Sequence, residues 1–304
     1  MPRHFLSLKD LDREELAGLI RRAIELKAML RRGEVYEPMK NGSLALIFEK
    51  SSTRTRVSFE VAATQFGGKA LFISPGDSQM GRGEPISDTA RVLSSMCDAI
   101  VMRTHSHDRI EELASFSRVP VINGLSDRYH PCQILADIQT IVEHTDSVAG
   151  KTIAWVGDGN NMCNSWINAT RLFDFDLRIA APPGYEADEV LIAENSDRVT
   201  TCTQAADAVD GADVVVTDTW ASMGQENEKE QRLKAFRDYS VNQSLMQKAS
   251  DKALFMHCLP AYRGCEVSGE VIDGEQSVVW DQAENRLHAQ KALMEFLLLE
   301  SQQK

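Results

Sequence analysis

The stretch FEKSSTRTRVSFE, residues 48–60, lies where two sequence patterns meet. The apolar run ALIFE predicts a buried strand, and TRVSFEVAATQF predicts a helix. The polar residues between these two runs therefore fall at the junction of a strand and a helix N-terminus. Arginines and hydroxyl residues gather at this junction, although the chain has a formal net charge of -12. This concentration of cationic groups needs a chemical explanation.

A helix N-terminus presents unpaired backbone N–H groups and the positive end of the helix dipole. At this N-terminus Ser52, Thr53 and Thr55 add hydroxyl groups. Arg54 adds a forked guanidinium group. Capping by one Ser or Thr would account for one hydroxyl group but not for the cations, which are disfavoured at a helix start. We interpret the stretch as an anion site suited to phosphate. Arg56 points elsewhere on the helix and is expected to form a structural ion pair.

Short β-rich apolar runs alternate with amphipathic stretches along almost the whole chain of 304 residues. This alternation predicts an α/β fold, in which helices cover parallel sheets. The strands are too numerous for one modest sheet, so we predict two doubly wound parallel-sheet domains. The predicted strands are residues 43–49, 69–74, 98–104, 119–123, 152–158, 177–182, 198–203, 213–218, 253–258 and 277–282.

The polar, glycine-containing segment TDSVAGK, residues 145–151, marks the predicted domain boundary. We expect a first domain at residues 1–146 and a second at residues 147–285. The closing segment ENRLHAQKALMEFLLLES predicts a long amphipathic helix, and residues 286–304 are expected to pack back on the first domain.

The overall composition excludes several classes of protein. An acidic balance argues against a nucleic-acid-binding surface and against a polybasic membrane contact. The N-terminus has no apolar signal region, and no apolar run reaches the ~18 residues that span a bilayer, so we expect a cytoplasmic protein. The six cysteines include no C-x-x-C pair and predict neither a disulfide framework nor a zinc site. We expect His105 and His107 to lie in an exposed polar turn without a role.

Three polar side chains of the first half stand at the ends of predicted elements. Arg103 is the last residue but one of the run DAIVMRT, and the carboxyl ends of parallel strands are where α/β sheets bind ligands. From the sequence alone, an arginine that extends past the edge of a sheet is an equally good interpretation. In the motif HPCQ, Pro131 suits the first position of a helix, so His130 and Gln133 can face one point.

The second half offers a glycine-rich turn and a strand that ends in an acid. The turn WVGDGNNM, residues 155–162, has methionine where a dinucleotide-binding motif has its third glycine, so we expect no NAD site. Asp218 ends the run VVVTD, where a carboxylate suits an ammonium group, although a cap or turn residue is the alternative. The charged segment at residues 224–236 is expected to be a lid that closes over a substrate and excludes water.

Four motifs resemble one enzyme family. SSTRTR, at residues 51–56, is similar to the carbamoyl-phosphate signature of the aspartate and ornithine carbamoyltransferases. HPCQILAD, DTWASMGQE and HCLPAYRG follow in the family's order and spacing, and the resemblance covers essentially the whole chain. The SMG that follows Asp-x-Trp and the HCLP motif resemble the ornithine branch. The aspartate branch has proline where this chain has Cys258.

The resemblance implies transfer of a carbamoyl group from carbamoyl phosphate to the δ-amine of L-ornithine, which gives L-citrulline and phosphate. It implies that the first domain binds carbamoyl phosphate, that the second binds ornithine, and that the active site is the cleft between them. It implies neither a metal ion nor an organic cofactor. The implied carbamoyl-phosphate residues are Ser52, Thr53, Arg54, Thr55, Gln79, Arg103, His130, Gln133, Cys258, Leu259 and Arg286. The implied ornithine residues are Asn161, Asp218, Ser222 and Met223.

The implied catalytic residues are Arg103, His130, Asp218 and Cys258. His130 would donate a hydrogen bond to the carbonyl oxygen where negative charge develops, and Gln133 would accept one from the carbamoyl NH2 group. Cys258 and Asp218 would help to remove the proton of the δ-ammonium group. A thiolate nucleophile is rejected, because the amine attacks and no covalent step is needed. From the sequence alone Arg286 could equally be a charge in the first turn of a helix.

The resemblance also implies a homotrimer, or a higher assembly of trimers, whose sites are shared between chains. The loop GDSQMGRGE, residues 76–84, would bring Gln79 into a neighbouring site, although a surface turn is the simpler interpretation. Two alternatives for function stay open. The acceptor could be a related amine such as putrescine or an acylated ornithine, or the chain could be a non-catalytic subunit that binds carbamoyl phosphate. The sequence does not encode the metabolic direction of the reaction.

Overall fold

A computed structural model describes residues 2–74, 76, 80, 83–221 and 228–302. The chain divides into two compact units, Met1–Gln139 with Glu284–Lys304, and Thr140–Ala283. The division lies within helix α5 (Pro131–Thr145), whereas the sequence analysis placed the boundary directly after that helix. Gln79, Ser222 and Met223 lie outside the described residues.

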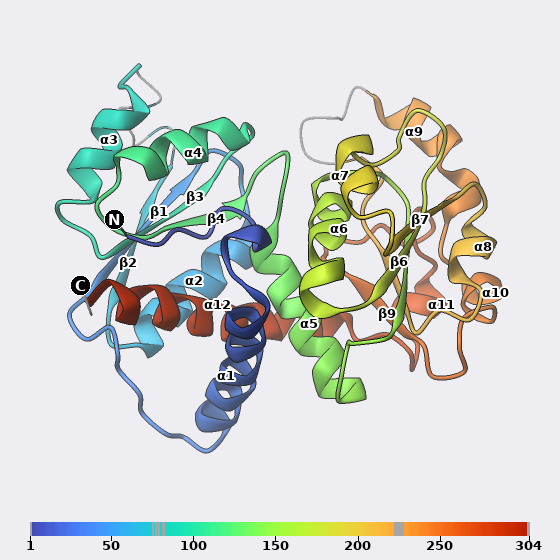
Figure 1. Ribbon diagram of the computed structural model, residues 1–304, viewed down its shortest axis with the longest axis horizontal. Coiled ribbons are helices and arrows are strands. Elements are labelled where there is room, and N and C mark those ends of the chain that lie inside the picture. Colours follow the sequence, from blue (N-terminus) through green and yellow to red (C-terminus); the bar gives the residue numbers. More distant parts are fainter. Residues whose placement is uncertain (1, 75, 77–79, 81–82, 222–227, 303–304) are drawn as a thin grey trace. The chain divides into compact units, whose positions relative to one another are not determined.

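The first unit contains a four-stranded parallel sheet in the order β2-β1-β3-β4 (Figure 1). Its strands are β1 (Ser43–Phe48), β2 (Lys69–Ile73), β3 (Ala99–Arg103) and β4 (Val121–Leu125). Helices α3 and α4 lie on one side of the sheet, and α2 and α12 lie on the other (Figure 1). The helices are η1 (Leu8–Asp10), α1 (Arg13–Arg31), α2 (Thr53–Gln65), α3 (Ile86–Leu93), α4 (His107–Phe116) and the part of α12 (Val279–Gln302) that starts at Glu284.

The second unit contains a five-stranded parallel sheet in the order β7-β6-β5-β8-β9. Its strands are β5 (Thr152–Val156), β6 (Asp176–Ala180), β7 (Val199–Cys202), β8 (Val214–Thr217) and β9 (Leu254–His257). Its helices include α6 (Asn161–Phe173), α7 (Glu189–Glu194), α8 (Ala205–Val209), α9 (Lys229–Ala235), η4 (Arg237–Tyr239), α10 (Gln243–Met246) and α11 (Gly269–Ile272). Both sheets are parallel and carry helices, which confirms the predicted α/β class.

The strand order gives each sheet a point where the connections leave in opposite directions. In the first unit this point lies between β1 and β3, and in the second it lies between β5 and β8. Ligands of doubly wound sheets bind outside the carboxyl ends of the strands at such a switch point. The fold therefore directs attention to the segments that follow these four strands.

Nine of the ten predicted strands are confirmed to within two residues at their ends, and the tenth, at residues 277–282, is wrong. Ser277 forms only an isolated parallel bridge with Phe255 of β9, and helix α12 begins at Val279. The run SVVW has the residue types of a strand, but the successive residues Val278 and Val279 are both buried, which departs from the alternation of a half-buried strand. The tertiary packing of a long helix overrides the local β propensity here.

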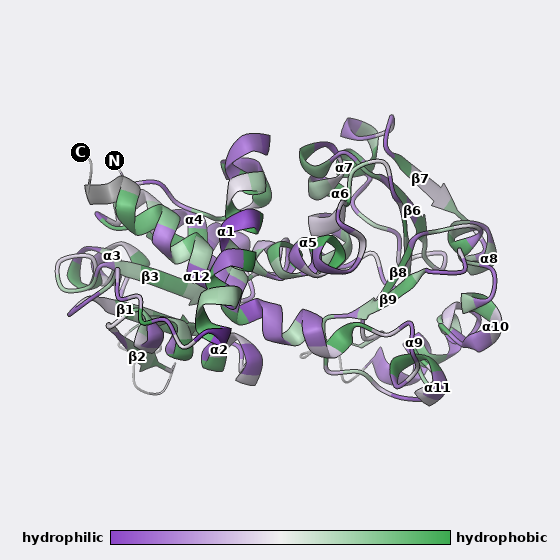
Figure 2. Cartoon of the chain, turned by 90° about the horizontal axis from the view of Figure 1, so that it is seen from below, coloured by the Kyte–Doolittle hydropathy of each residue, from purple (hydrophilic) through white to green (hydrophobic). Residues whose placement is uncertain are grey.

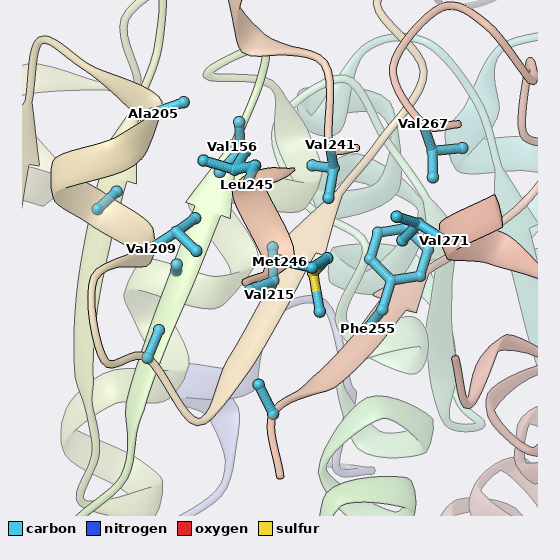
Figure 3. Packing of buried hydrophobic residues seen from close by; sticks show 14 of the residues in the cluster. Val156, Ala205, Val209, Val215, Val241, Leu245, Met246, Phe255, Val267 and Val271 are labelled. Atoms are coloured by element: carbon cyan, nitrogen blue, oxygen red, sulfur yellow. The ribbon is translucent and has the colours of Figure 1, made fainter. Parts of the chain in front are cut away.

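Apolar side chains from strands and helices form the core of the second unit (Figure 3). Val215 of β8 and Phe255 of β9 are fully buried, and Val209 and Val271 pack against them from α8 and α11. This core fixes the ends of β8 and β9, from which the polar residues of the site extend.

Hydropathy varies along every helix of both units. Strands β3 and β9 are drawn mainly in the green of apolar residues, whereas the helices alternate between purple and green (Figure 2). Within the described residues, the helices lack the combination of length and apolar character that crossing a membrane would require.

Candidate active site

The anion-site stretch opens helix α2 at the carboxyl end of β1. Ser52 caps the helix, and its hydroxyl oxygen accepts a hydrogen bond from the backbone N–H of Thr55 at 3.2 Å. Thr53 is exposed and Arg54 is half-buried, whereas Thr55 is buried. Helix capping, the simpler interpretation of the stretch, thus accounts for the Ser52 hydroxyl group. It does not account for the guanidinium group of Arg54. Arg56 pairs with Glu60 at 2.8 Å, as expected.

Arg103 lies at the carboxyl end of β3 and is 6% exposed, so it does not extend past the sheet edge into water. It pairs in register with Phe48, and its carbonyl oxygen accepts from the N–H of Glu49 at 2.8 Å. The register of β3 against β4 shifts between Met102 and Arg103, which is a β-bulge. The extra residue, Gly124, is on β4, and the register of β1 against β3 places Arg103 opposite Phe48, at the start of the anion-site stretch.

The opposing glycine makes this bulge possible. A Cβ atom on Gly124 would lie 3.1 Å from Cγ1 of Val101 and 3.3 Å from the carbonyl oxygen of Met102. Those distances are closer than ordinary contacts, so a larger residue would push β4 away from β3. Gly124 therefore helps to set the position of Arg103, although no sequence motif marked it.

Helices α5 and α12 bring further predicted residues to the same unit. Arg286, which is buried, donates to the amide oxygen of Gln133 at 2.6 Å and to the hydroxyl oxygen of Thr55 at 3.1 Å. The amide nitrogen of Gln133 donates to Asp137 at 2.8 Å. Arg286 is therefore no isolated first-turn charge, because it links α2 to α5.

His130 is surrounded by positive charge. It precedes α5, is 5% exposed, and its pKa lies well below the ordinary value because burial and the nearby charges of Arg286, Arg103 and Arg54 all disfavour the imidazolium form. The structure thus brings three predicted arginines around one neutral histidine. A site that is electropositive and partly closed to water suits a doubly charged phosphate ester.

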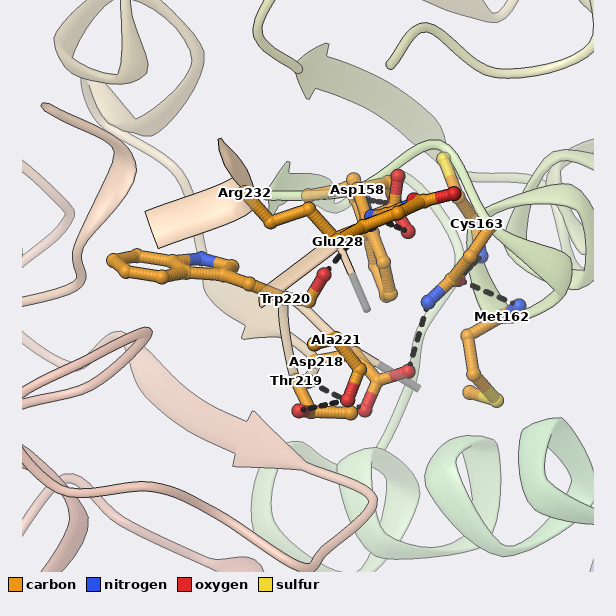
Figure 4. Close-up of polar contacts among 11 residues, drawn as sticks. Asp158, Met162, Cys163, Asp218, Thr219, Trp220, Ala221, Glu228 and Arg232 are labelled. Atoms are coloured by element: carbon orange, nitrogen blue, oxygen red, sulfur yellow. Dashed lines mark hydrogen bonds and ion pairs between the residues drawn. The ribbon is translucent and has the colours of Figure 1, made fainter. Parts of the chain in front are cut away.

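The second group of predicted residues follows β5 and β8 of the second unit. Asn160 caps α6 by accepting from the N–H groups of Met162 at 2.9 Å and Cys163 at 3.2 Å. Its amide nitrogen also donates to Oδ2 of Asp218 at 3.0 Å (Figure 4). Asn161 is the first residue of α6 and is half-buried. The cap of one helix therefore holds the acid at the end of the neighbouring strand.

The carboxylate of Asp218 is 6% exposed and accepts several hydrogen bonds. Its Oδ1 atom accepts from the N–H of Thr219 at 2.7 Å and from the thiol of Cys258 at 3.1 Å. Since Cys258 follows β9, which pairs with β8, the register brings both predicted proton acceptors together. The thiol proton is directed at a carboxylate, which agrees with the rejection of a thiolate nucleophile.

His257 supports the segment that follows β9. Its Nδ1 atom accepts from the backbone N–H of Leu259 at 2.8 Å, and its Nε2 atom lies 3.2 Å from Oε1 of Glu266. The proton is thereby assigned to Nε2, because Nδ1 acts as an acceptor. Leu259 has a φ of 59°, a left-handed conformation that costs roughly 1–2 kcal/mol in a residue other than glycine. The His257 contact holds this residue in that conformation.

Asp218, His257 and Cys258 are also the described residues that could hold a metal ion, since their ligand atoms lie within 4.8 Å of one another. Both ring nitrogens of His257 already have protein partners, however, and a metal ion would have to displace Leu259 or Glu266. The donor set therefore does not fit a resident metal ion.

The expectation for His107 is also wrong. His107 is not in an exposed turn: it is buried as the first residue of α4, and its Nδ1 atom lies 2.9 Å from the hydroxyl group of Ser126. The ring of His107 also packs edge-on against Tyr129. The polar residues around His107 suggested a turn, but a helix begins there and the His107 side chain points into the protein. His105 is exposed, as expected.

Comparison with known proteins agrees with this geometry. Residues 3–143 match the carbamoyl-P binding domain of aspartate/ornithine carbamoyltransferase, and residues 149–297 match the Asp/Orn binding domain. A protein named ornithine carbamoyltransferase from Methylococcus capsulatus is 62% identical over 98% of this chain and 99% of its own length. The chain belongs to the aspartate/ornithine carbamoyltransferase family. The family resemblance found in the four sequence motifs is confirmed.

Other members of the aspartate/ornithine carbamoyltransferase family match over similar lengths. The anabolic ornithine carbamoyltransferase of Pseudomonas aeruginosa is 57% identical over 97% of both chains. The crystal structure of ornithine carbamoyltransferase from Burkholderia thailandensis has a TM-score of 0.91 and 51% identity, and covers 98% of this chain and 99% of that one. The enzyme from Pyrococcus furiosus has a TM-score of 0.92 and 48% identity, with 96% of each chain covered.

Proposed function

We propose that this member of the family transfers the carbamoyl group of carbamoyl phosphate to the δ-amine of L-ornithine, which yields L-citrulline and phosphate. The observation that carries the proposal is the convergence of Arg54, Arg103 and Arg286 on His130, whose pKa is lowered. The names of the relatives support the same reaction, since those at 56–62% identity are called ornithine carbamoyltransferase. The name of the Pseudomonas aeruginosa relative favours the biosynthetic direction.

The first unit supplies the electrophile. In the proposed step the neutral amine nitrogen bonds to the carbonyl carbon, and the bond from that carbon to the phosphate oxygen breaks, with its electron pair leaving on phosphate. The proton that the nitrogen loses in this step ends on the released phosphate. Arg54 and Arg103, with the hydroxyl groups of Ser52, Thr53 and Thr55, hold the phosphate, and they stabilise it most as it gains charge in the transition state. Neutral His130 donates a hydrogen bond to the carbonyl oxygen.

Gln133 and Arg286 have a more specific place in this proposal. Arg286 already donates to one lone pair of the Gln133 amide oxygen, and the second lone pair is left to accept from the carbamoyl NH2 group. The Asp137 contact orients the amide so that its oxygen faces Arg286. In this way Arg286 contributes positive charge and also fixes the acceptor that identifies a carbamoyl group.

The second unit supplies the nucleophile. Asp218 offers a buried carboxylate to the ammonium groups of ornithine, and Asn161, Ser222 and Met223 complete the proposed binding set. Asp218 and Cys258 share one hydrogen bond, and they are the proposed route by which the δ-ammonium group loses the proton that prevents attack. Because the N–H of Leu259 is bonded to His257, any contact of Leu259 with the carbamoyl group uses its carbonyl oxygen.

We further propose that the chain works as a homotrimer, in which Gln79 of one chain completes the site of its neighbour. The motif resemblance supports this assembly, and its test is whether activity requires residues from two chains.

The test of the proposed reaction measures phosphate and citrulline from the purified chain with carbamoyl phosphate, with and without ornithine. We expect ornithine-dependent release of both products in equal amounts. Parallel assays with putrescine and with an Nα-acylated ornithine should give little turnover, because Asp218 needs an α-ammonium partner. Faster turnover with either amine would identify that amine, instead of ornithine, as the acceptor. The absence of turnover with every amine would indicate a non-catalytic subunit that binds carbamoyl phosphate.

A further inference from the structure

Arg232 of α9 is a buried cation that belongs to none of the four motifs. It is 6% exposed, and its Nη1 atom donates at 2.9 Å both to Oδ2 of Asp158 and to the carbonyl oxygen of Trp220 (Figure 4). Its Nε atom donates to Glu228 at 3.1 Å. One guanidinium group thus joins the segments that follow β5 and β8, and Glu228 holds it from its own helix.

Aromatic side chains surround this group. The guanidinium carbon lies 4.8 Å from the ring centre of Tyr185 and 5.9 Å from that of Phe236. Trp220 stacks on Phe236, with ring centres 5.7 Å apart and planes at 26°. Because these rings exclude water, the hydrogen bonds of Arg232 are less screened than those of a surface arginine, and the guanidinium group is fixed in orientation.

The two segments that Arg232 joins carry the proposed ornithine residues. Asp158 stands directly before the turn that holds Asn160 and Asn161, and Trp220 lies two residues after Asp218. The contact from Asn160 to Asp218 at 3.0 Å is a first tie between these segments. Arg232 provides a second tie on the other side of the same turn, so the positions of Asn161 and Asp218 depend on both.

The ion pair of Asp158 and Arg232 is not explained by a contribution to the stability of the fold. Burial raises the pKa of Asp158 to about 6, and the neighbouring charges of Asp218 and Glu228 act in the same direction, although Arg232 opposes them. For the Asp158 carboxylate, the cost of leaving water therefore exceeds what its attraction to Arg232 returns. Buried ion pairs are often replaceable by apolar residues without loss of stability, so a geometric role accounts for this one better.

We infer that Arg232 and Asp158 form a positioning pair for the amino-acid substrate, which fixes Asn161 and Asp218 in the arrangement that binds ornithine. The pair contacts neither substrate itself. The inference rests on the proposed function, and it predicts a loss that is specific to ornithine, because the pair belongs to the second unit whereas the phosphate-binding Arg54 and Arg103 belong to the first.

The test compares Arg232→Gln, Asp158→Asn and Arg232→Lys with the unchanged chain. We expect the KM for ornithine to rise about tenfold or more, which corresponds to ~1.4 kcal/mol, in Arg232→Gln and Asp158→Asn. The KM for carbamoyl phosphate should stay within about twofold in both variants, since the anion site is separate. Arg232→Lys should show a smaller rise, because one ammonium group keeps the charge but loses the fixed plane of the guanidinium group.

A matched control is Arg171→Gln, which removes an ion pair of Arg171 and Asp197 at 2.5 Å between exposed side chains of the same unit. This variant should leave both KM values unchanged. An unchanged KM for ornithine in a folded Arg232→Gln chain would overturn the inference, and so would a parallel rise for both substrates. If Arg232→Gln does not fold, Arg232→Lys decides by the same criterion. Failure of the unchanged chain to make citrulline would instead overturn the proposed function.

Discussion

Arg54 and Arg56 stand two residues apart, yet their surroundings assign them different work. Arg56 bonds to Glu60 at 2.8 Å and lies over the ring of Phe72, with 3.7 Å between the guanidinium carbon and the ring centre. Glu60 therefore neutralises the charge of Arg56, and Phe72 covers one face of its guanidinium group. Arg54 is half-buried and close enough to His130 to lower its pKa. The two arginines therefore form a natural pair of test and control.

Arg54→Ala should reduce turnover by an order of magnitude or more, because a charge-assisted hydrogen bond in a dry site contributes about 1.5–3 kcal/mol. The steady-state rate of citrulline formation measures the loss, and the KM for carbamoyl phosphate should rise with it. Arg56→Ala should keep nearly full activity. Equal losses in both variants would remove the special role of Arg54.

A second prediction concerns the pH dependence of His130. Its folded pKa is lowered, so the folded state binds fewer protons than the unfolded state once the pH falls below the unfolded value of 6.5. The stabilising effect of a neutral His130 is therefore complete above pH 6.5 and is lost as the pH falls toward the folded pKa. The corresponding slope is at most about 1.4 kcal/mol per pH unit for one proton.

Urea unfolding of the unchanged chain and of His130→Gln between pH 7 and pH 5 measures this difference. The stability of the unchanged chain should fall more steeply than that of the variant, while His4, His107 and His288 contribute equally to both. Identical slopes would show that His130 titrates normally. The acid limb of the activity profile should likewise contain no group with the ordinary pKa of histidine.

The elements of the second unit depend on the apolar core beneath them. Phe255 of β9 is fully buried between residues of β8 and α11, and it lies three positions before Cys258. Phe255→Ala should lower the free energy of unfolding by about 3–5 kcal/mol, since the lost transfer energy and the cavity both count. Thermal or urea unfolding measures the change. Val190→Ala on α7, whose side chain is 66% exposed, should change stability by less than about 0.5 kcal/mol.

Local pattern was enough to predict most elements, because nine strands are short apolar runs bounded by polar turns. It failed at residues 277–282, where Val278 and Val279 favour a strand and only the contacts of α12 decide for a helix. It failed at His107 for a related reason: the neighbouring polar residues carry no information about the contacts of its ring with Ser126 and Tyr129. Both errors concern contacts between residues that are distant in the sequence.

At the scale of the molecule, the predicted residues fall into two groups, one in each unit. Most members of each group follow a strand, where a motif is easy to locate, whereas Arg286 lies on α12 and belongs to none of the four motifs. The tie between Asp158 and Arg232 was not predictable, since 74 residues separate the two and Arg232 sits in the charged run that was predicted to be a lid. The Asp-Gly pair after β5 marks a tight turn in the sequence. Gly159 approaches the backbone of Glu186 so closely there that a Cβ atom on it would lie 2.2 Å from the carbonyl carbon of Glu186.

Sharing of sites between chains can be tested by mixing two inactive variants. Gln79→Ala and Asp218→Asn should each be nearly inactive alone, since one would remove a contact supplied to the neighbour and the other a contact made within the chain. In a mixed trimer some sites combine Gln79 from one chain with Asp218 from the other, and those sites are intact. Unfolding and refolding the two variants together should therefore restore part of the activity, with a mass three times that of the 33.8 kDa chain. If each site were built from a single chain, every site in the mixture would carry one lesion and no activity would return.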